Sequence, residues 1–460
     1  METTLNYVNE VTVEAPVDAS RTRVMAGYYF ATFWCILFTG SIRKWMFPHV
    51  SILYLFQDIP ICLAYFYALR TGMYSLGVMF FGIVAISVVV TLQTLAQIVL
   101  IGHDWIVAII GLHHYLFYLP MLLIFPLCLT EKYRRDFIRW NLLLSIPMCL
   151  LVVAQAQSPK ASFINRTSEG ETMGLPGVEV PRVSGTYNFV AFYGIWVGMA
   201  FALCMGEWLL RRERRVFQSR WLLTICTFCL TICGLVSGSR QTIFLAALSL
   251  LGALFAAFVL GSGRAMLAIG GIFLLLPVTA VSTYLISPVE YNTINERLFA
   301  ERNATDSRNR MLGSFYDFLI YPEFSLIGRG VGYGVDAAHF GNANAYNFAY
   351  ELSEADTTRN VMELGTPVGL FYVTIRFSLI FGMFLLSVKI VRSGSTPHVL
   401  ALSFMLGGQT LADLTRAATM TSTQVMVGYA FILGVQLYPD NASLENSNSD
   451  LVTEFSGRQI

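Results

Sequence analysis

Charged side chains are scarce in this sequence. Asp, Glu, Lys and Arg together make up 13% of the 460 residues, and 55% of the residues are hydrophobic. A soluble domain carries roughly 25% charged residues. The formal net charge is +1, and no stretch forms the concentrated basic face that nucleic-acid phosphates attract. The composition therefore argues against a water-soluble globule and against a nucleic-acid partner.

Cysteines are missing from the long polar stretches, where a disulfide would be useful. All eight lie inside apolar runs: Cys35, Cys62, Cys128, Cys149, Cys204, Cys226, Cys229 and Cys233. The last three have helical spacing, which packing of small apolar side chains explains better than a metal site does. We therefore expect no disulfide framework, no metal and no other cofactor.

The sequence is instead rich in long runs of apolar residues. Several reach about 18 residues or more, the length that crosses roughly 30 Å of hydrocarbon as a helix. Because lipid offers no partners for backbone amides, each such run must be helical. The first 23 residues are polar and mixed in charge, unlike a cleaved signal peptide, so we expect the chain to be anchored by its own helices.

The sequence thus predicts an all-α polytopic membrane protein with about twelve transmembrane helices. The expected spans lie near residues 24–41, 51–69, 75–100, 105–130, 138–156, 187–208, 221–237, 242–260, 265–285, 366–391, 398–414 and 421–437.

Basic residues predict the orientation, because short Lys/Arg-rich loops stay in the cytoplasm. The densest such loops lie near residues 211–220 and 132–139. Placing both inside gives a cytoplasmic tail at 1–23, nine helices in 24–285 with an extracytoplasmic loop at 157–186, a large extracytoplasmic loop at 286–365, three helices in 366–437 and a cytoplasmic tail at 438–460. Arg43 and Lys44 are the exception, because this count places them outside.

The loop at 286–365 mixes arginines and carboxylates with many aromatic side chains, which is unlike a disordered tether. We expect it to be folded, mainly helical and packed on the outer face of the bundle. Arginine matches its planar fork of donors to phosphate oxygens, so several converging arginines would suit a lipid-linked pyrophosphate. The alternative is that each arginine pairs with a neighbouring carboxylate.

Arg240 stands in a polar turn between two strongly apolar runs, in the sequence SGSRQT at residues 237–242. A charge close to the hydrocarbon is costly and usually faces a polar cavity. A functional role for Arg240 is therefore favoured over snorkelling to the lipid headgroups.

Four glycines alternate within the long loop, at Gly328, Gly330, Gly332 and Gly334. A dinucleotide-binding fingerprint needs a preceding strand and a βαβ unit, and neither is predicted here. The spacing instead favours a tight turn whose bare backbone approaches a ligand or another helix.

An acidic segment leads into the apolar run at 366–391. On a helix, Asp356, Arg359 and Glu363 share one face at spacings of three and four, whereas Glu354 and Asp356 do not share a face. An acid beside an arginine at the mouth of a cavity is suited to act as a general base or to orient an acceptor hydroxyl. The alternative is a salt bridge at a helix end.

These features in this order resemble the O-antigen ligase and Wzy-type polysaccharide polymerase family of bacterial inner membranes. The resemblance covers roughly residues 220–390: the turn ending at Arg240, the long exported loop, its glycine-rich segment and the Glu363-Leu-Gly365 start of the next span. It implies metal-independent transfer of a glycan from undecaprenyl pyrophosphate to an acceptor hydroxyl, with inversion at the anomeric carbon, on the periplasmic side of the bacterial inner membrane.

The resemblance also implies site residues and partners. Arginines would hold the pyrophosphate and neutralise the charge that develops on it: by matching position Arg240 first, then Arg308, Arg310 and Arg359 of the loop. Glu354 or Asp356 would take the proton of the acceptor. The implied partners are the undecaprenyl-pyrophosphate-linked oligosaccharide, the lipid bilayer and a chain-length regulator of the same export pathway.

One departure from the family pattern bears on the reaction. Ligases of this family usually carry a His-Asn pair shortly before the Glu-x-Gly element, and here the stretch from Glu354 to Asn360 contains no histidine. This leaves the identity of the base open. It favours a polymerase that extends an exopolysaccharide or O-antigen-like chain, with a glycan ligase as the alternative.

A further alternative from another class is a twelve-helix transporter or flippase. Such a protein would place polar side chains deep in the bundle. The predicted spans offer few of them, chiefly Asp58, Gln93, Gln97 and Glu207. We also see no internal repeat relating the first six spans to the last six, as many transporters have.

Overall fold

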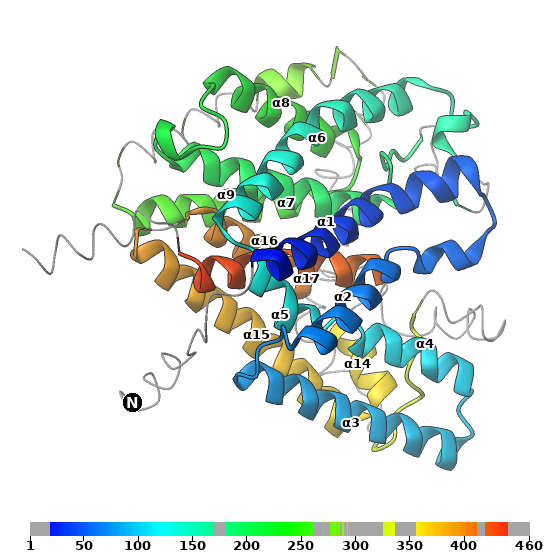
Figure 1. Cartoon of the computed structure of the whole chain (residues 1–460). Helices are drawn as coiled ribbons and strands as arrows, with labels where there is room; N and C mark the ends of the chain where they lie inside the picture. Colours follow the sequence, from blue (N-terminus) through cyan, green and yellow to red (C-terminus); the bar gives the residue numbers. More distant parts are fainter. Residues whose placement is uncertain are drawn as a thin grey trace, which may run out of the picture.

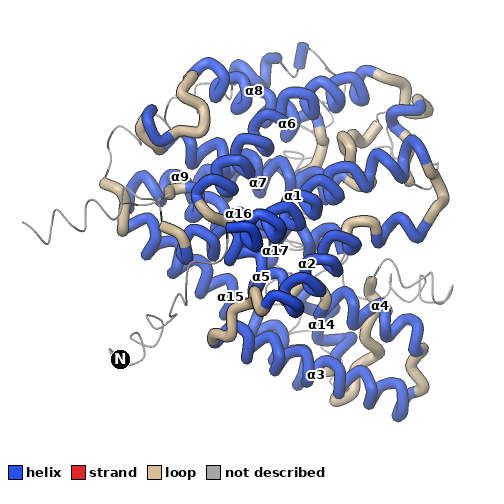
Figure 2. The backbone as a smooth tube through the Cα atoms, viewed as in Figure 1, coloured by secondary structure: helices blue, strands red, loops and turns tan. Residues whose placement is uncertain are grey.

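The computed structural model describes residues 19–168, 181–261, 325–335, 356–394, 396–411 and 419–439, with isolated residues between 263 and 292. Most of these residues are helical, and no strand occurs among them (Figures 1 and 2). Eight of their helical segments are long and apolar enough to cross a membrane. The prediction of an all-α polytopic membrane protein is therefore confirmed.

The helices follow the apolar runs of the sequence. The membrane-length segments are α1 (Ala19–Ser41) with the π-helical turn after it, α3 (Val78–Ile101), α4 (Trp105–Leu116) with the turns after it, α6 (Glu131–Gln157), α7 (Val190–Leu209), α9 (Arg240–Val259), α15 (Thr366–Arg392) and α17 (Thr419–Leu437). The shorter helices are α2 (Asp58–Thr71), α5 (Met121–Ile124), α8 (Arg220–Val236), α14 (Asp356–Leu364) and α16 (His398–Leu411).

Eleven of the twelve predicted spans correspond to these helices. The span expected at 51–69 consists of a 3-10 turn (Ser51–Leu55) and the short helix α2, and in the span expected at 105–130 a turn near Pro120 separates α4 from α5. The span expected at 265–285 lies mostly outside the described residues. The count of twelve, and the placement of the two long loops outside the membrane, stay predictions.

The centre of the bundle is α7. Every residue from Val190 to Glu207 is buried, and α7 lies in the middle of the molecule in Figure 1, packed against α9 and α16. A Cβ added at Gly206 would lie 2.3 Å from the His398 ring of α16, and one at Gly194 would lie 2.5 Å from Thr242 Oγ1 of α9. Small residues of this kind let membrane helices approach closely.

The helices α3 and α15 lie at the edge of the bundle and carry most of their apolar side chains on the surface. Such all-round apolar but half-exposed helices suit contact with lipid tails. Two glutamines of α3, Gln93 and Gln97, nevertheless point into the protein, where they bind the chain near residue 327. α3 therefore supports the segment that forms the site described below.

Arg43 and Lys44, the exception to the predicted charge distribution, lie in the π-helical turn Ile42–Met46. Lys44 is buried, and its Nζ donates to Ser184 Oγ at 3.0 Å and to the carbonyls of Gly185 and Tyr187 at 3.1 and 3.0 Å. Lys44 therefore anchors the segment before α7. Because Lys44 is buried and hydrogen-bonded within the fold, it is not evidence for membrane orientation in the way that a loop lysine is.

Candidate functional site

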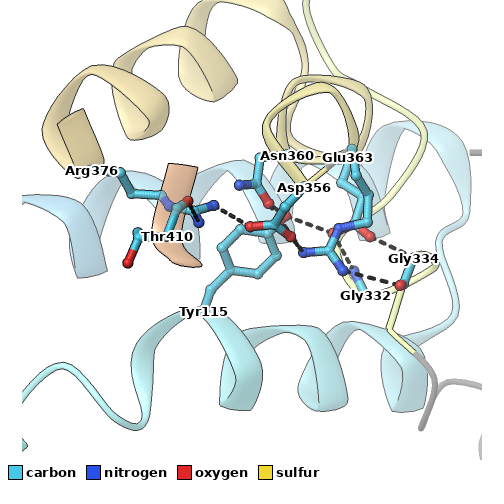
Figure 3. A network of polar contacts seen from close by, with 9 residues as sticks. Tyr115, Gly332, Gly334, Asp356, Asn360, Glu363, Arg376 and Thr410 are labelled. Carbon is cyan, nitrogen blue, oxygen red and sulfur yellow. Dashed lines mark hydrogen bonds and ion pairs between the residues drawn. The ribbon is translucent and has the colours of Figure 1, made fainter. Parts of the chain in front are cut away.

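The carboxylate of Glu363, on α14, organises the glycine-rich segment. Glu363 is fully buried, and Oε2 accepts from the Tyr115 hydroxyl at 2.8 Å and from the Gly332 amide at 3.2 Å, while Oε1 accepts from the Gly334 amide at 2.6 Å. Figure 3 shows these donors converging on the carboxylate from α4 and from the glycine turn. The acid thus satisfies two bare amides that would otherwise be buried without partners.

The alternating glycines fit because no side chain has room at these positions. Gly332 has a φ of +101°, and a Cβ there would lie 2.4 Å from the Val107 carbonyl of α4 and 2.9 Å from Gly111 Cα. A Cβ on Gly334 would lie 2.2 Å from Arg359 Cδ. The bare backbone therefore approaches helices α4 and α14, which is one of the two outcomes that the spacing predicts.

The side chain of Gln97 fastens this turn to α3. Its Nε2 donates to the carbonyls of Ile327 and Glu363, both at 2.6 Å, and its Oε1 accepts from the Val331 amide at 2.9 Å. Gln93 Nε2 donates to the Ile327 carbonyl at 2.7 Å. The glycine turn and the end of α14 are therefore held as one unit.

Asp356, the first residue of α14, is buried between two guanidinium groups. It forms ion pairs with Arg359 of the same helix and with Arg376 of α15, as Figure 3 shows for Arg376. Arg359 also donates to the Gly334 carbonyl at 3.1 Å and Arg376 to the Thr410 carbonyl at 2.9 Å. Three described elements and the glycine turn thus meet at one carboxylate.

These two arginines also set the protonation of Asp356. Burial by itself would raise the pKa of the carboxyl, but the charges of Arg359 and Arg376 outweigh it and lower the pKa to about 2. Ionised carboxylates beside guanidinium groups behave in this way. Asp356 therefore stays charged at physiological pH and is a weak proton acceptor.

A cavity of about 90 Å³ opens beside the ion pairs, several times the space that one buried water needs. Its lining comes from five helices (α4, α14, α15, α16 and α17) and includes His114, Tyr115, Asp356, Arg359, Asn360, Arg376, Gln409, Thr410 and Thr421. Asn360 Nδ2 and Thr421 Oγ1 are buried there without hydrogen-bond partners among the described residues. The cavity is therefore lined by two positive groups and by polar atoms that remain available to a ligand.

The structure places part of the predicted site in this cavity. Asp356 and Arg359 line it and form the ion pair that was the structural alternative for this segment. Glu354, Arg308 and Arg310 lie outside the described residues. The interpretation of these three stays a prediction.

Arg240 begins α9 and is not among the described residues that line the cavity. The next residue, Gln241, connects α9 to it, because Gln241 Nε2 lies 2.8 Å from Oε1 of Gln409, a lining residue. The polar turn at 237–242 thus ends beside the cavity wall.

Sequence reasoning missed Arg376, His114 and Tyr115. Arg376 stands in the middle of the apolar run at 366–391, and a charge inside a membrane span is itself a signal of a functional or paired residue. His114, in the predicted span at 105–130, carries a signal of the same kind, since ionisable side chains in such spans include histidine. Tyr115 carries none, and the proximity of both residues to α14 depends on how α4 packs.

The polar residues that a transporter would use are engaged in structural contacts. Gln93 and Gln97 hold the glycine turn. Glu207 Oε1 lies 3.1 Å from the His398 ring, and Asp58 accepts from the Tyr118 hydroxyl at 2.7 Å and lies 3.1 Å from His113 Nε2. None of the four is among the described residues that line the cavity.

Neither metal or disulfide chemistry in the described residues nor a similar known protein gives an independent assignment of function. Among the described residues, no group of three or more His, Cys, Asp or Glu is placed to hold a metal ion. The eight cysteines, Cys226, Cys229 and Cys233 of α8 among them, are free thiols. No protein-family model, curated protein or solved structure matches this chain.

Proposed function

We propose that this protein is a polysaccharide polymerase of the bacterial inner membrane. It extends an exopolysaccharide or O-antigen-like chain from repeat units linked to undecaprenyl pyrophosphate, without a metal and with inversion at the anomeric carbon. The observation that supports the proposal best is the pair Arg359 and Arg376, which converge from two helices on one carboxylate at the edge of a polar cavity.

The arginine pair suits the leaving group of this reaction. Charge develops on the pyrophosphate as the bond to the sugar breaks, and donors fixed in advance stabilise such charge most strongly. Asp356 holds both guanidinium groups in place, and its pKa of about 2 keeps that support constant over the physiological pH range. Arg240, Arg308 and Arg310 are proposed to contact the same pyrophosphate from their own segments.

The structure changes the role that we propose for Asp356. A carboxylate bound by two guanidinium groups has little basicity left, so Asp356 positions the arginines and does not take the acceptor proton. Glu354 remains the sequence-derived candidate for that step.

The proposal can be tested by the glycan profile of a deletion strain that carries Arg376→Ala. We expect single repeat units to accumulate on lipid, because the leaving group loses one of its two cations. Arg392→Ala is the matched control, since Arg392 is an exposed arginine at the other end of the same helix. Protein amounts in the membrane are compared by immunoblot.

Each other outcome assigns a different function. Long lipid-linked chains that never reach an acceptor would identify a glycan ligase, which would share this site and differ in its acceptor. A glycan profile unchanged by deletion of the gene would reject both and favour the transporter.

A further inference from the structure

Three polar side chains around the cavity lack the partners that buried groups normally have. Asn360 Nδ2, Thr421 Oγ1 and His114 Nδ1 are all enclosed without a hydrogen bond among the described residues, and they come from α14, α17 and α4. Leaving such a group unsatisfied costs about 1–3 kcal/mol. Three of them on one cavity therefore indicate a ligand with several hydroxyl groups.

His114 differs from the other groups that face this cavity. Asp356 is bound by Arg359 and Arg376, and the tyrosines offer only weakly basic hydroxyls. Glu363, behind Tyr115, already accepts three hydrogen bonds. The neighbouring His113 turns to Asp58 and does not line the cavity among the described residues. The His114 imidazole is thus the one uncharged nitrogen base in the described lining, and its Nδ1 has no hydrogen-bond partner among the described residues.

We propose that His114 takes the proton of the acceptor hydroxyl, and that Asn360 and Thr421 hydrogen-bond the other hydroxyls of the acceptor sugar. This inference rests on the proposed function. It assigns to α4 the histidine that the segment before Glu363 lacks.

The step balances without a further reactant. The acceptor O–H gives its proton to the neutral His114 ring while its oxygen forms the new bond to the anomeric carbon. The bond from that carbon to the pyrophosphate oxygen breaks, and undecaprenyl pyrophosphate leaves with the electron pair between Arg359 and Arg376. The imidazolium then returns its proton to water before the next cycle.

The experiment compares the His114→Gln protein with wild type in reconstituted membranes. The lipid fraction of the deletion strain, which would contain the accumulated repeat units, serves as substrate, and undecaprenyl pyrophosphate alone serves as the binding probe. Loss of a general base typically costs about 10²–10⁴-fold in rate. We expect polymer formation to fall by at least about 100-fold, whereas the thermal stabilisation by undecaprenyl pyrophosphate stays as in wild type.

Two further variants separate a chemical role from a structural one. His113→Gln removes the adjacent imidazole, keeps a donor for Asp58 and should retain polymer formation within a few-fold. His114→Asn, a second change at the same site, should be as inactive as His114→Gln, with melting temperatures of all three proteins compared directly.

The outcomes distinguish the inference from the function on which it rests. If His114→Gln polymerises normally and Glu354→Gln does not, the inference is overturned and the proposed function stands. If His114→Gln loses binding of undecaprenyl pyrophosphate together with activity, the residue is structural. If wild type itself neither binds the probe nor forms polymer, the proposed function fails.

Discussion

At the scale of single residues, Glu363 is the most heavily used carboxylate of the described site. Replacing it by glutamine puts an amide group where the Gly332 and Gly334 amides and the Tyr115 hydroxyl now donate. We expect Glu363→Gln to lower the free energy of unfolding by about 1–3 kcal/mol, measured by thermal melting in lipid nanodiscs. Glu213→Gln, at an exposed position, is the control. Equal melting temperatures for the two variants would contradict the assignment.

The lowered pKa of Asp356 leads us to expect a particular pH dependence of stability. Its pKa is lowered from 3.8 to about 2 in the folded protein, so its contribution to stability is fully present above pH 3.8 and is lost as the pH falls through about 2. Asp356→Asn leaves two arginines without their partner, which typically costs about 3–5 kcal/mol for a buried pair.

We therefore expect the melting temperatures of Asp356→Asn and wild type to differ by a constant amount from pH 8 to pH 5. The gap should narrow only in strong acid. A gap that closes near neutral pH would show that another group holds the two arginines in place.

At the scale of elements, the glycine turn depends on its close approach to α4. Gly332→Ala would place a methyl group 2.4 Å from the Val107 carbonyl at a φ of +101°, so the turn must move. We expect a loss of about 1–3 kcal/mol in the free energy of unfolding, with reduced glycan formation because Arg359 binds the Gly334 carbonyl.

Gly82→Ala on α3 is the matched control for this substitution. No atom lies within 4 Å of an added Cβ at Gly82, and alanine favours helix over glycine by about 0.5–1 kcal/mol. The two substitutions should therefore change the melting temperature in opposite directions. A Gly332→Ala protein as stable as Gly82→Ala would mean that the turn does not pack as described.

The sequence predicts most of the helices, but it predicts little of how these helices come together around the cavity. Apolar length alone locates α3, α7, α9 and α15 to within a few residues, because lipid forces such runs into helices. The spacing of Asp356, Arg359 and Glu363 also predicts their shared helix face. Contacts of α4 with α14 could not be predicted, since they depend on packing between segments about 240 residues apart, as between Tyr115 and Asn360.

At the scale of the whole molecule, several of the cavity residues come from helix ends that the charge pattern assigns to one side of the membrane. These are the start of α14, the end of α16 and the start of α17. The basic segment at 211–220 follows the end of α7 and belongs to the opposite side in the same pattern. The proposed periplasmic position of the site therefore depends on this orientation.

The orientation can be measured with single cysteines and a membrane-impermeant thiol reagent. A cysteine replacing Lys160 should be labelled in cells with a permeabilised outer membrane, whereas one replacing Glu213 should react only after lysis, because α7 separates the two positions. The unmodified chain, with its eight cysteines, gives the background. The reverse labelling pattern would place the cavity in the cytoplasm.

The complete burial of α7 also has a consequence for biosynthesis. Its burial is completed by α16 and α17, the last two helices of the described chain, which leave the ribosome long after α7 has entered the membrane. Until they arrive, the small-residue face around Gly206, which packs against His398 of α16, has only lipid or the insertion machinery beside it. Premature termination before α16 should therefore yield an incomplete bundle that cellular proteases recognise, even though every preceding helix has been inserted.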